Sequence, residues 1–234
     1  MVSETLSAAA LPILGESRPR TVTDQIFDLL YERVVNLTLP PGAKLSEAEV
    51  AAQMGVSRQP VRDAFYRLSQ LGFIQIRPQR ATVITQISEQ AVLQAYFIRA
   101  ALEESCMRVA AEKLTVEQMD ALDELVERQA EAIETNRRPD FHILDDQFHR
   151  DICAYSGLEF VWVLVKENKG HMDRARYLSL TYGARTALDE HRLILAALRD
   201  RDPQRAAAAV RHHLSQIEGI IARLRIEQPG VFDG

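Results

Sequence analysis

Residues 39–84 read LPPGAKLSEAEVAAQMGVSRQPVRDAFYRLSQLGFIQIRPQRATVI and carry the signals of two helices followed by a hairpin. Ser46 precedes Glu49 by three residues, a capping-box spacing that predicts a short helix over 47–54, and Gly55 ends it. Ser57 can cap a second helix that runs to about Gln70. Two helices joined by so short a turn are typical of a helix-turn-helix.

The second helix has one apolar and one polar face. Val61, Phe65 and Leu68 recur at helical spacing and predict its buried stripe. After Gly72, the β-prone runs 73–76 and 81–84 flank the turn 77–80, so a hairpin with a basic tip follows the helices. We therefore expect a winged helix-turn-helix whose second helix enters the major groove of DNA. The candidate DNA-binding residues on its outer face and wing tip are Ser57, Arg58, Gln59, Arg62 and Arg80.

This stretch resembles the N-terminal domain of GntR-type bacterial transcription regulators over about residues 21–85. The resemblance lies in Pro41-Gly42, Leu45-Ser46-Glu47, Val56-Ser57-Arg58, Pro60-Val61-Arg62-Asp63-Ala64 and Leu71-Gly72-Phe73. Two positions depart from the family pattern. Gln59 replaces a more usual Thr, which puts the base preference in doubt, and Ala81 replaces the usual Gly of the wing.

Charge and length indicate two domains. The chain has 234 residues and a formal net charge of −5. Residues 18–87 hold nine Lys or Arg against six Asp or Glu, a net of +3, which leaves −8 for the rest. A basic segment inside an acidic chain is expected of a DNA-binding domain. We expect a disordered tail over 1–17, the DNA-binding domain over 18–87 and a helical domain over 88–228.

Neither cysteine usage nor hydropathy suggests secretion or a membrane. Cys106 and Cys153 have apolar neighbours in helical patterns, so we interpret them as core thiols in a reducing compartment. No apolar run approaches the roughly 20 residues needed to span a bilayer. Residues 1–15 lack the basic start of a signal peptide. These features predict a cytoplasmic protein that has no membrane partner.

From Ser88 onward, the sequence predicts an antiparallel bundle of six helices, so the whole chain is expected to be mainly α. Ser88, Thr115 with Gln118, Asp140 and Asp202 are the expected N-caps. The expected helices span about 88–113, 115–136, 140–156, 158–182, 185–199 and 202–227.

Four side chains from three of these helices are candidate metal ligands. Asp145 and His149 lie one turn apart beside the apolar face of the 140–156 helix, and His191 and His213 lie among apolar residues of two later helices. A single histidine on an apolar face is more often a hydrogen-bonded core residue than a ligand. One carboxylate and three imidazoles together suit Zn, Ni, Mn or Fe(II), and a cation would relieve the cost of a buried carboxylate.

The helical region also resembles the FCD effector domain of the FadR branch of GntR regulators, over about residues 90–225. The matching segments are Asp145-x-x-Phe148-His149, His191-x-x-Ile194-Leu195-x-Ala197-Leu198 and His213-Leu214. The resemblance implies that Asp145, His149, His191 and His213 hold a divalent metal, with Zn or Ni preferred. His142 is the competing ligand in the sequence, but it has no counterpart in the family pattern.

Two arginines are candidates for binding an effector. Arg99 resembles a family arginine that contacts the effector, although an i,i+4 ion pair with Glu103 explains it equally well. Asp173-Arg174-Ala175-Arg176 adds two guanidiniums, of which we select Arg174; a charged helix surface is the alternative. Leu158 stands after Ser156-Gly157 where many relatives have Asn, so the ligand of the pocket can differ from the common hydroxy acids and dicarboxylates.

These features predict a metabolite-responsive transcription regulator, with repression the expected sign. A homodimer would bind a palindromic operator, and a small organic acid bound at the metal would change operator affinity. Two alternatives stay open. A metal-dependent hydrolase would need a general base, and Glu190 beside His191 is expected to point elsewhere on its helix. A DNA-binding scaffold with a purely structural metal would not respond to an acid.

Overall fold

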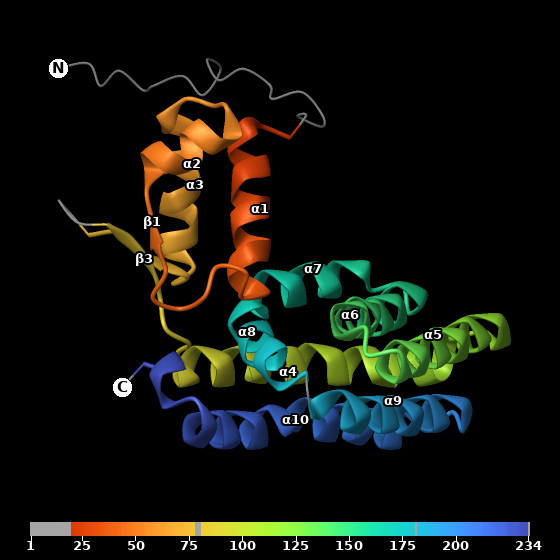
Figure 1. Ribbon diagram of the computed structural model, residues 1–234. Coiled ribbons are helices and arrows are strands. Elements are labelled where there is room, and N and C mark those ends of the chain that lie inside the picture. Colours follow the sequence, from red (N-terminus) through yellow and green to blue (C-terminus); the bar gives the residue numbers. More distant parts are fainter. Residues whose placement is uncertain (1–19, 78–80, 181, 234) are drawn as a thin grey trace, which may run out of the picture.

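The computed structural model describes residues 20–77, 81–180 and 182–233, and Figure 1 shows their arrangement. Within these ranges, ten α-helices and one small sheet form a winged helix-turn-helix followed by a helical bundle. The mainly α fold predicted from the sequence is therefore confirmed. The expected tail over 1–17 lies outside the described residues, as does the wing-tip segment 78–80 with Arg80.

The N-terminal part is built from three helices and three short strands. They are α1 (Val22–Val35), β1 (Lys44–Leu45), α2 (Glu47–Met54), α3 (Arg58–Gln70), β2 (Ile74–Gln75) and β3 (Thr82–Ile84). The strand order is β1-β3-β2, and both pairings are antiparallel, with Lys44 opposite Val83 and Ile74 opposite Ile84. Neither α1 nor β1 was individually predicted from the sequence.

Local capping explains where these helices begin. Thr21 and Asp24 form a complete capping box at the start of α1, and Ser46 Oγ accepts a 3.4 Å hydrogen bond from Glu49 N at the start of α2. Ser57 occupies the N-cap position of α3, as predicted, but its hydroxyl makes no capping bond and stays exposed. The predicted stripe Val61, Phe65 and Leu68 is fully buried in a core of its own beneath α1 and the sheet.

The helical part holds a second, larger core. Two 25-residue helices, α4 (Glu89–Lys113) and α10 (Pro203–Glu227), pack side by side. Around them lie α5 (Val116–Glu134), α6 (Arg138–Tyr155), α7 (Glu159–Asn168), α8 (Gly170–Ser179) and α9 (Gly183–Arg199), and a 3-10 turn (Pro229–Val231) follows α10. Figure 1 shows α8 directly under α1, so this helix meets the winged part.

Two predictions for the bundle were wrong. The expected helix over 158–182 is two helices, α7 and α8, with Lys169 between them. A Cβ added at Gly170 would collide with Tyr31 and Phe73, so the bend falls where the bundle approaches the winged part closely enough to require glycine. Asp140 does not cap α6. The N-cap is Arg137, and Pro139 fits the first turn, where a backbone N–H is not needed.

Cys106 and Cys153 are free, buried thiols whose sulfur atoms lie 3.5 Å apart between α4 and α6, in agreement with the sequence interpretation. The hydrogen bond with Cys106, together with burial, raises the pKa of Cys153, so this thiol stays protonated. Among the described residues, no helix combines the length and apolar character needed to cross a bilayer.

Candidate metal centre and effector cavity

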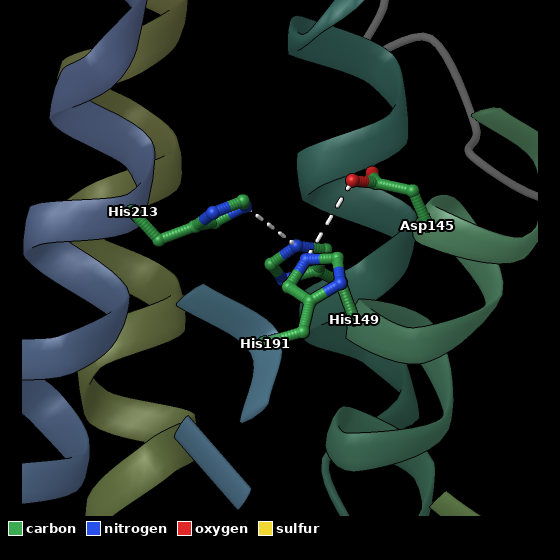
Figure 2. A group of neighbouring side chains, drawn as sticks. All are labelled: Asp145, His149, His191 and His213. Atoms are coloured by element: carbon green, nitrogen blue, oxygen red, sulfur yellow. Dashed lines mark hydrogen bonds and ion pairs between the residues drawn. The ribbon is translucent and has the colours of Figure 1, made fainter. Parts of the chain in front are cut away.

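Four buried side chains from α6, α9 and α10 converge inside the bundle. Figure 2 shows Asp145 and His149 from α6, His191 from α9 and His213 from α10 pointing toward one another. One potential ligand atom of each lies within 4.8 Å of the corresponding atoms of the others. His149 Nε2 and His213 Nε2 are 3.2 Å apart, and His191 Nε2 is 3.6 Å from Asp145 Oδ1. The fold thus brings together all four residues selected from the sequence.

A second set of side chains orients the three imidazoles. His149 Nδ1 lies 2.6 Å from Glu103 Oε2, and His213 Nδ1 lies 2.9 Å from Glu190 Oε2. His191 Nδ1 lies 2.7 Å from the side-chain oxygen of Gln129. The Gln129 amide nitrogen donates to the Leu144 carbonyl at 3.1 Å, which turns its oxygen toward the histidine. Each Nδ1 therefore lies against a side-chain oxygen, an arrangement in which Nδ1 holds the ring proton whenever that oxygen accepts it.

This proton arrangement leaves the centre of the cluster rich in lone pairs. A neutral ring whose Nδ1 donates the proton presents Nε2 as an acceptor. Two such nitrogens face each other, and within the described residues Asp145 Oδ1 and His191 Nε2 have no hydrogen-bond partner. Buried acceptors without donors are costly, and a cation would satisfy them together. The residues present therefore fit a divalent metal held by three imidazole nitrogens and one carboxylate oxygen.

Protonation states agree with this ligand set. Burial lowers the pKa of His191 far below its ordinary value, and burial together with His149 lowers the pKa of His213 to about 3. Burial alone would raise the pKa of Asp145, but the Arg176 guanidinium and the surrounding histidines outweigh it and hold that pKa well below its usual range. The cluster thus offers neutral imidazoles at His191 and His213 and an ionised carboxylate at Asp145, the forms that bind metals.

Arg176 is the arginine of α8 that reaches this cluster. Its guanidinium pairs with Asp145 Oδ2, and its Nη1 lies 3.2 Å from Asp173 Oδ1. Arg174, the residue selected from the sequence, lies elsewhere. Its guanidinium donates to the backbone carbonyls of Thr85 and Gln86 in the segment that joins the two parts of the chain. Residues two apart on a helix point about 200° apart, so only one of the two arginines can face the cluster.

A cavity of about 230 Å³ adjoins the cluster, and His213, Arg99 and Arg176 contribute to its wall. Arg99 is completely buried, and its Nε donates to Glu103 Oε1 at 2.6 Å. The i,i+4 ion pair anticipated from the sequence is therefore present. However, Nη1 and Nη2 of Arg99 have no hydrogen-bond partner among the described residues. The cavity is thus lined by a buried arginine whose two terminal nitrogens have no hydrogen-bond partner among the described residues.

The competing histidine belongs to a different group. His142 lies with Asp146 and Asp173, and its ring packs against Tyr177 with centroids 4.2 Å apart. Lys169 Nζ lies 2.8 Å from Asp146 Oδ2 and also pairs with Asp173. The lysine ammonium already supplies the positive charge between these two carboxylates. A metal ion is therefore not needed to balance this second group.

The candidate DNA-binding residues lie on the exposed face of α3. Ser57, Arg58 and Gln59 are exposed at its N-terminal end, where Gln59 Nε2 donates to Asp63 Oδ1 at 2.8 Å. Arg62 is exposed one turn later, and its Nε lies 3.3 Å from Glu47 Oε2 on α2. Arg67 faces the other way, since it pairs with Asp24 of α1 at 2.8 Å and lies over the Phe27 ring. One side of α3 is therefore exposed to solvent, whereas the side that carries Arg67 contacts α1.

Comparison with known families matches both parts of the chain. Residues 22–84 match the bacterial regulatory proteins of the gntR family, and residues 94–216 match the FCD domain. The chain belongs to the GntR family. It is a transcription regulator, with a winged helix-turn-helix that binds DNA and an FCD domain that binds effectors.

Individual GntR relatives are similar over most of their length. The HTH-type transcriptional repressor RspR of Escherichia coli K12 is 36% identical over 90% of this chain and 93% of its own. The "Probable D-xylose utilization operon transcriptional repressor" of Paenarthrobacter nicotinovorans is 30% identical over 83% and 86%. The solved structure of E. coli McbR/YncC superposes with a TM-score of 0.73 at 22% identity, over 88% of this chain and 99% of that one, and supports the fold.

The hydrolase alternative is wrong, because the family and the relatives are transcription regulators. The expectation that Glu190 points away from the cluster also fails. Burial raises the pKa of Glu190 to about 7, and its carboxyl group lies against His213 Nδ1. Glu190, Glu103 and Gln129 were not identified from the sequence as partners of the histidines. The only available signal was their helical register, one residue before His191 for Glu190 and one turn after Arg99 for Glu103.

Proposed function

We propose that this regulator is a repressor whose operator affinity is controlled by a small carboxylate bound at a divalent metal in the FCD domain. The observation that carries the proposal is the cluster of Asp145, His149, His191 and His213 beside a cavity whose wall includes Arg99. Zn or Ni suits three imidazoles and one carboxylate. The metal would supply positive charge and open coordination positions, and Arg99 with Arg176 would complete an anion site. Arg174 is not part of this proposal.

For operator binding, we expect Arg58 and Arg62 to supply the main contacts from α3. A good bidentate arginine–base contact is worth about 1–3 kcal/mol, so Arg58→Ala and Arg62→Ala should each weaken operator affinity by roughly 5- to 150-fold. Fluorescence anisotropy at one fixed salt concentration measures the change. Arg67→Ala is the matched control, because this arginine lies on the same helix but contacts α1. Wild-type affinity in both test variants would show that their charges are only solvated.

For effector binding, the critical residue is expected to be Arg99. A thermal-shift screen of small carboxylates on metal-replete protein identifies a binder, and calorimetry measures its affinity. Arg99→Lys keeps a positive charge beside Glu103 but removes the guanidinium nitrogens that lack partners. Losing a charge-assisted hydrogen bond of about 1.5–3 kcal/mol should weaken binding roughly ten- to a hundredfold.

Ligand-free operator binding should be unchanged in Arg99→Lys, because Arg99 is buried inside the bundle and its hydrogen-bond partner among the described residues is Glu103 of the same helix. Full carboxylate affinity in this variant would reduce Arg99 to an ion-pair partner of Glu103. Loss of operator binding without any carboxylate would instead assign Arg99 a role in maintaining the fold. If no carboxylate binds the wild-type protein, the scaffold with a purely structural metal becomes the better interpretation.

We further infer a homodimer, which would place two copies of α3 on the half-sites of a palindromic operator. Large apolar side chains are exposed on two helices that pack together, Phe97 on α4 and Phe160 on α7. We expect sedimentation to give twice the chain mass of 26.4 kDa for the wild type and a shift toward 26.4 kDa for Phe97→Asp and Phe160→Asp. Ile143→Asp, an equally exposed apolar site on α6, should stay dimeric. Dimers in all three variants would show that neither Phe97 nor Phe160 is needed for the dimer.

A further inference from the structure

The segment Thr85–Ile87, which joins the winged part to α4, is bonded from two sides. On one side lies the C-terminal end of the chain. Ile87 pairs with Phe232 as a parallel bridge, with Ile87 N bonded to Val231 O at 2.9 Å and Asp233 N bonded to Ile87 O at 3.1 Å. Gln86 Nε2 donates to Gly230 O at 3.1 Å. Ile87 and Phe232 are both buried in the core of the bundle, so residues 229–233 form a strap across the joining segment.

On the other side lies Arg174 of α8. Its Nη2 donates to Thr85 O at 2.5 Å, and its Nη1 donates to Gln86 O at 3.4 Å. Arg174 is fully buried, and among the described residues no carboxylate pairs with it. Burial lowers its pKa to about 10. A buried guanidinium without a counter-ion is costly, so the two carbonyls of the joining segment are its main stabilising partners.

The same helix contacts the winged part directly. The His171 ring stacks on Phe73 with centroids 4.4 Å apart, and His171 Nε2 lies 2.8 Å from the Leu71 carbonyl oxygen. Thr85 is tied to that part as well, since its hydroxyl donates to Gly72 O at 2.6 Å. Any rotation of the winged part about residues 85–87 would therefore break bonds to α8 and to the strap.

The opposite side of α8 faces the effector cavity. Arg176 contributes to the cavity wall and pairs with the candidate metal ligand Asp145 and with Asp173. One short helix thus holds the joining segment through Arg174 and the cavity through Arg176, two residues later. A change in the partners of Arg176 would have to be accommodated by α8, which contacts α1 on one side and α4 and α10 on the other.

We propose that Thr85–Ile87 is a clamped joint, held by Arg174 and the C-terminal strap, and that α8 transmits the state of the cavity to this joint. The clamp itself is independent of any ligand. Only the link between the clamp and the cavity rests on the function proposed above. The clamp and this link are tested by separate variants. In this arrangement, the strap fixes one side of the joint while α8 is the side that responds.

Hydrogen–deuterium exchange of the full chain, without added ligand or operator, tests the clamp. We compare the peptide covering residues 82–88 in the wild type, in Arg174→Met and in a chain truncated after Gln228. Losing hydrogen bonds to a charged group or to the strap should speed exchange in this peptide by roughly tenfold or more. Arg201→Met is the matched control, because Arg201 also donates to a backbone carbonyl, that of Ala111, and not to the joining segment.

Arg176→Lys tests whether α8 connects the cavity to the joint at residues 85–87, with Arg201→Lys as its control. Arg176 does not bond residues 85–87, so faster exchange there would have to arrive through α8. Unchanged exchange in this variant would overturn the role of α8 while leaving the clamp intact. Wild-type exchange at 82–88 in both clamp variants would overturn the clamp. Exchange that rises evenly over both parts of the chain would also contradict the proposal, because the contacts would then stabilise the whole fold.

Discussion

Wild-type protein purified without chelator is expected to carry one divalent transition-metal ion per chain, and His191→Ala with His213→Ala is expected to carry almost none. The reason is geometric. The double substitution removes two of four ligands, and with the three Nδ1 atoms turned toward Glu190, Glu103 and Gln129, the lost Nε2 atoms have no substitutes nearby. Elemental analysis of the dialysed proteins measures the ratio.

Two single variants serve as controls for the metal assignment. His142→Ala removes the histidine that lies with Asp146 and Asp173, and His212→Ala removes an exposed neighbour of His213. Both should retain the ion. Equal metal content in the wild type and the double variant would refute the assignment of ligands. Loss of the ion in His142→Ala alone would move the metal to the second group, despite the Lys169 ammonium there.

Replacing Arg176 by Met should lower the free energy of unfolding of the metal-free protein by about 3–5 kcal/mol, the usual cost of removing one partner from a buried ion pair. Asp145 and Asp173 are both buried and both pair with this guanidinium, although Asp173 also pairs with Lys169. The loss should be smaller in metal-replete protein, because an ion beside Asp145 would compensate one of the two carboxylates. Urea titration measures the free energy of unfolding. Trp162 fluorescence can follow it, because Trp162 is the single tryptophan of the sequence and lies in the bundle.

Arg199→Met is the matched control for that experiment. Arg199 also pairs with two aspartates, Asp120 and Asp123, but all three side chains are substantially exposed. Exposed ion pairs contribute little, so this variant should unfold close to the wild type. A similarly small effect for Arg176→Met would mean that the Asp145 carboxylate is stabilised mainly by its histidine neighbours.

Much of the fold could be predicted because its determinants are local. The Ser46 cap, the Thr115–Gln118 capping box and the Val61, Phe65 and Leu68 stripe each act within a few residues. The bend between α7 and α8 could not be predicted in this way. At this bend, Gly170 lies against Tyr31 and Phe73, which come from a different part of the chain. The hydrophobic pattern within residues 158–182 cannot predict a contact with residues outside that segment.

The candidate site was predictable in its ligands and not in its surroundings. Asp145 and His149 lie one turn apart on one helix face, a relation that the sequence states directly. Choosing between Arg174 and Arg176 requires the rotation of α8, which follows from the bend and from packing against the winged part. Likewise, Gln129 reaches His191 only because α5 packs against α9. Tertiary packing, and not helical register, decides these contacts.

The central claim is that a small carboxylate bound at the metal controls operator affinity. Its most direct test is a titration of labelled operator with metal-replete protein, with and without the carboxylate found by thermal shift, repeated on His191→Ala with His213→Ala. We predict that the carboxylate weakens operator binding by the wild type, by about 5- to 150-fold for an ordinary allosteric coupling, and leaves the double variant unaffected. Operator affinity that does not change with the carboxylate in wild-type protein, or that changes equally in both proteins, would contradict the account.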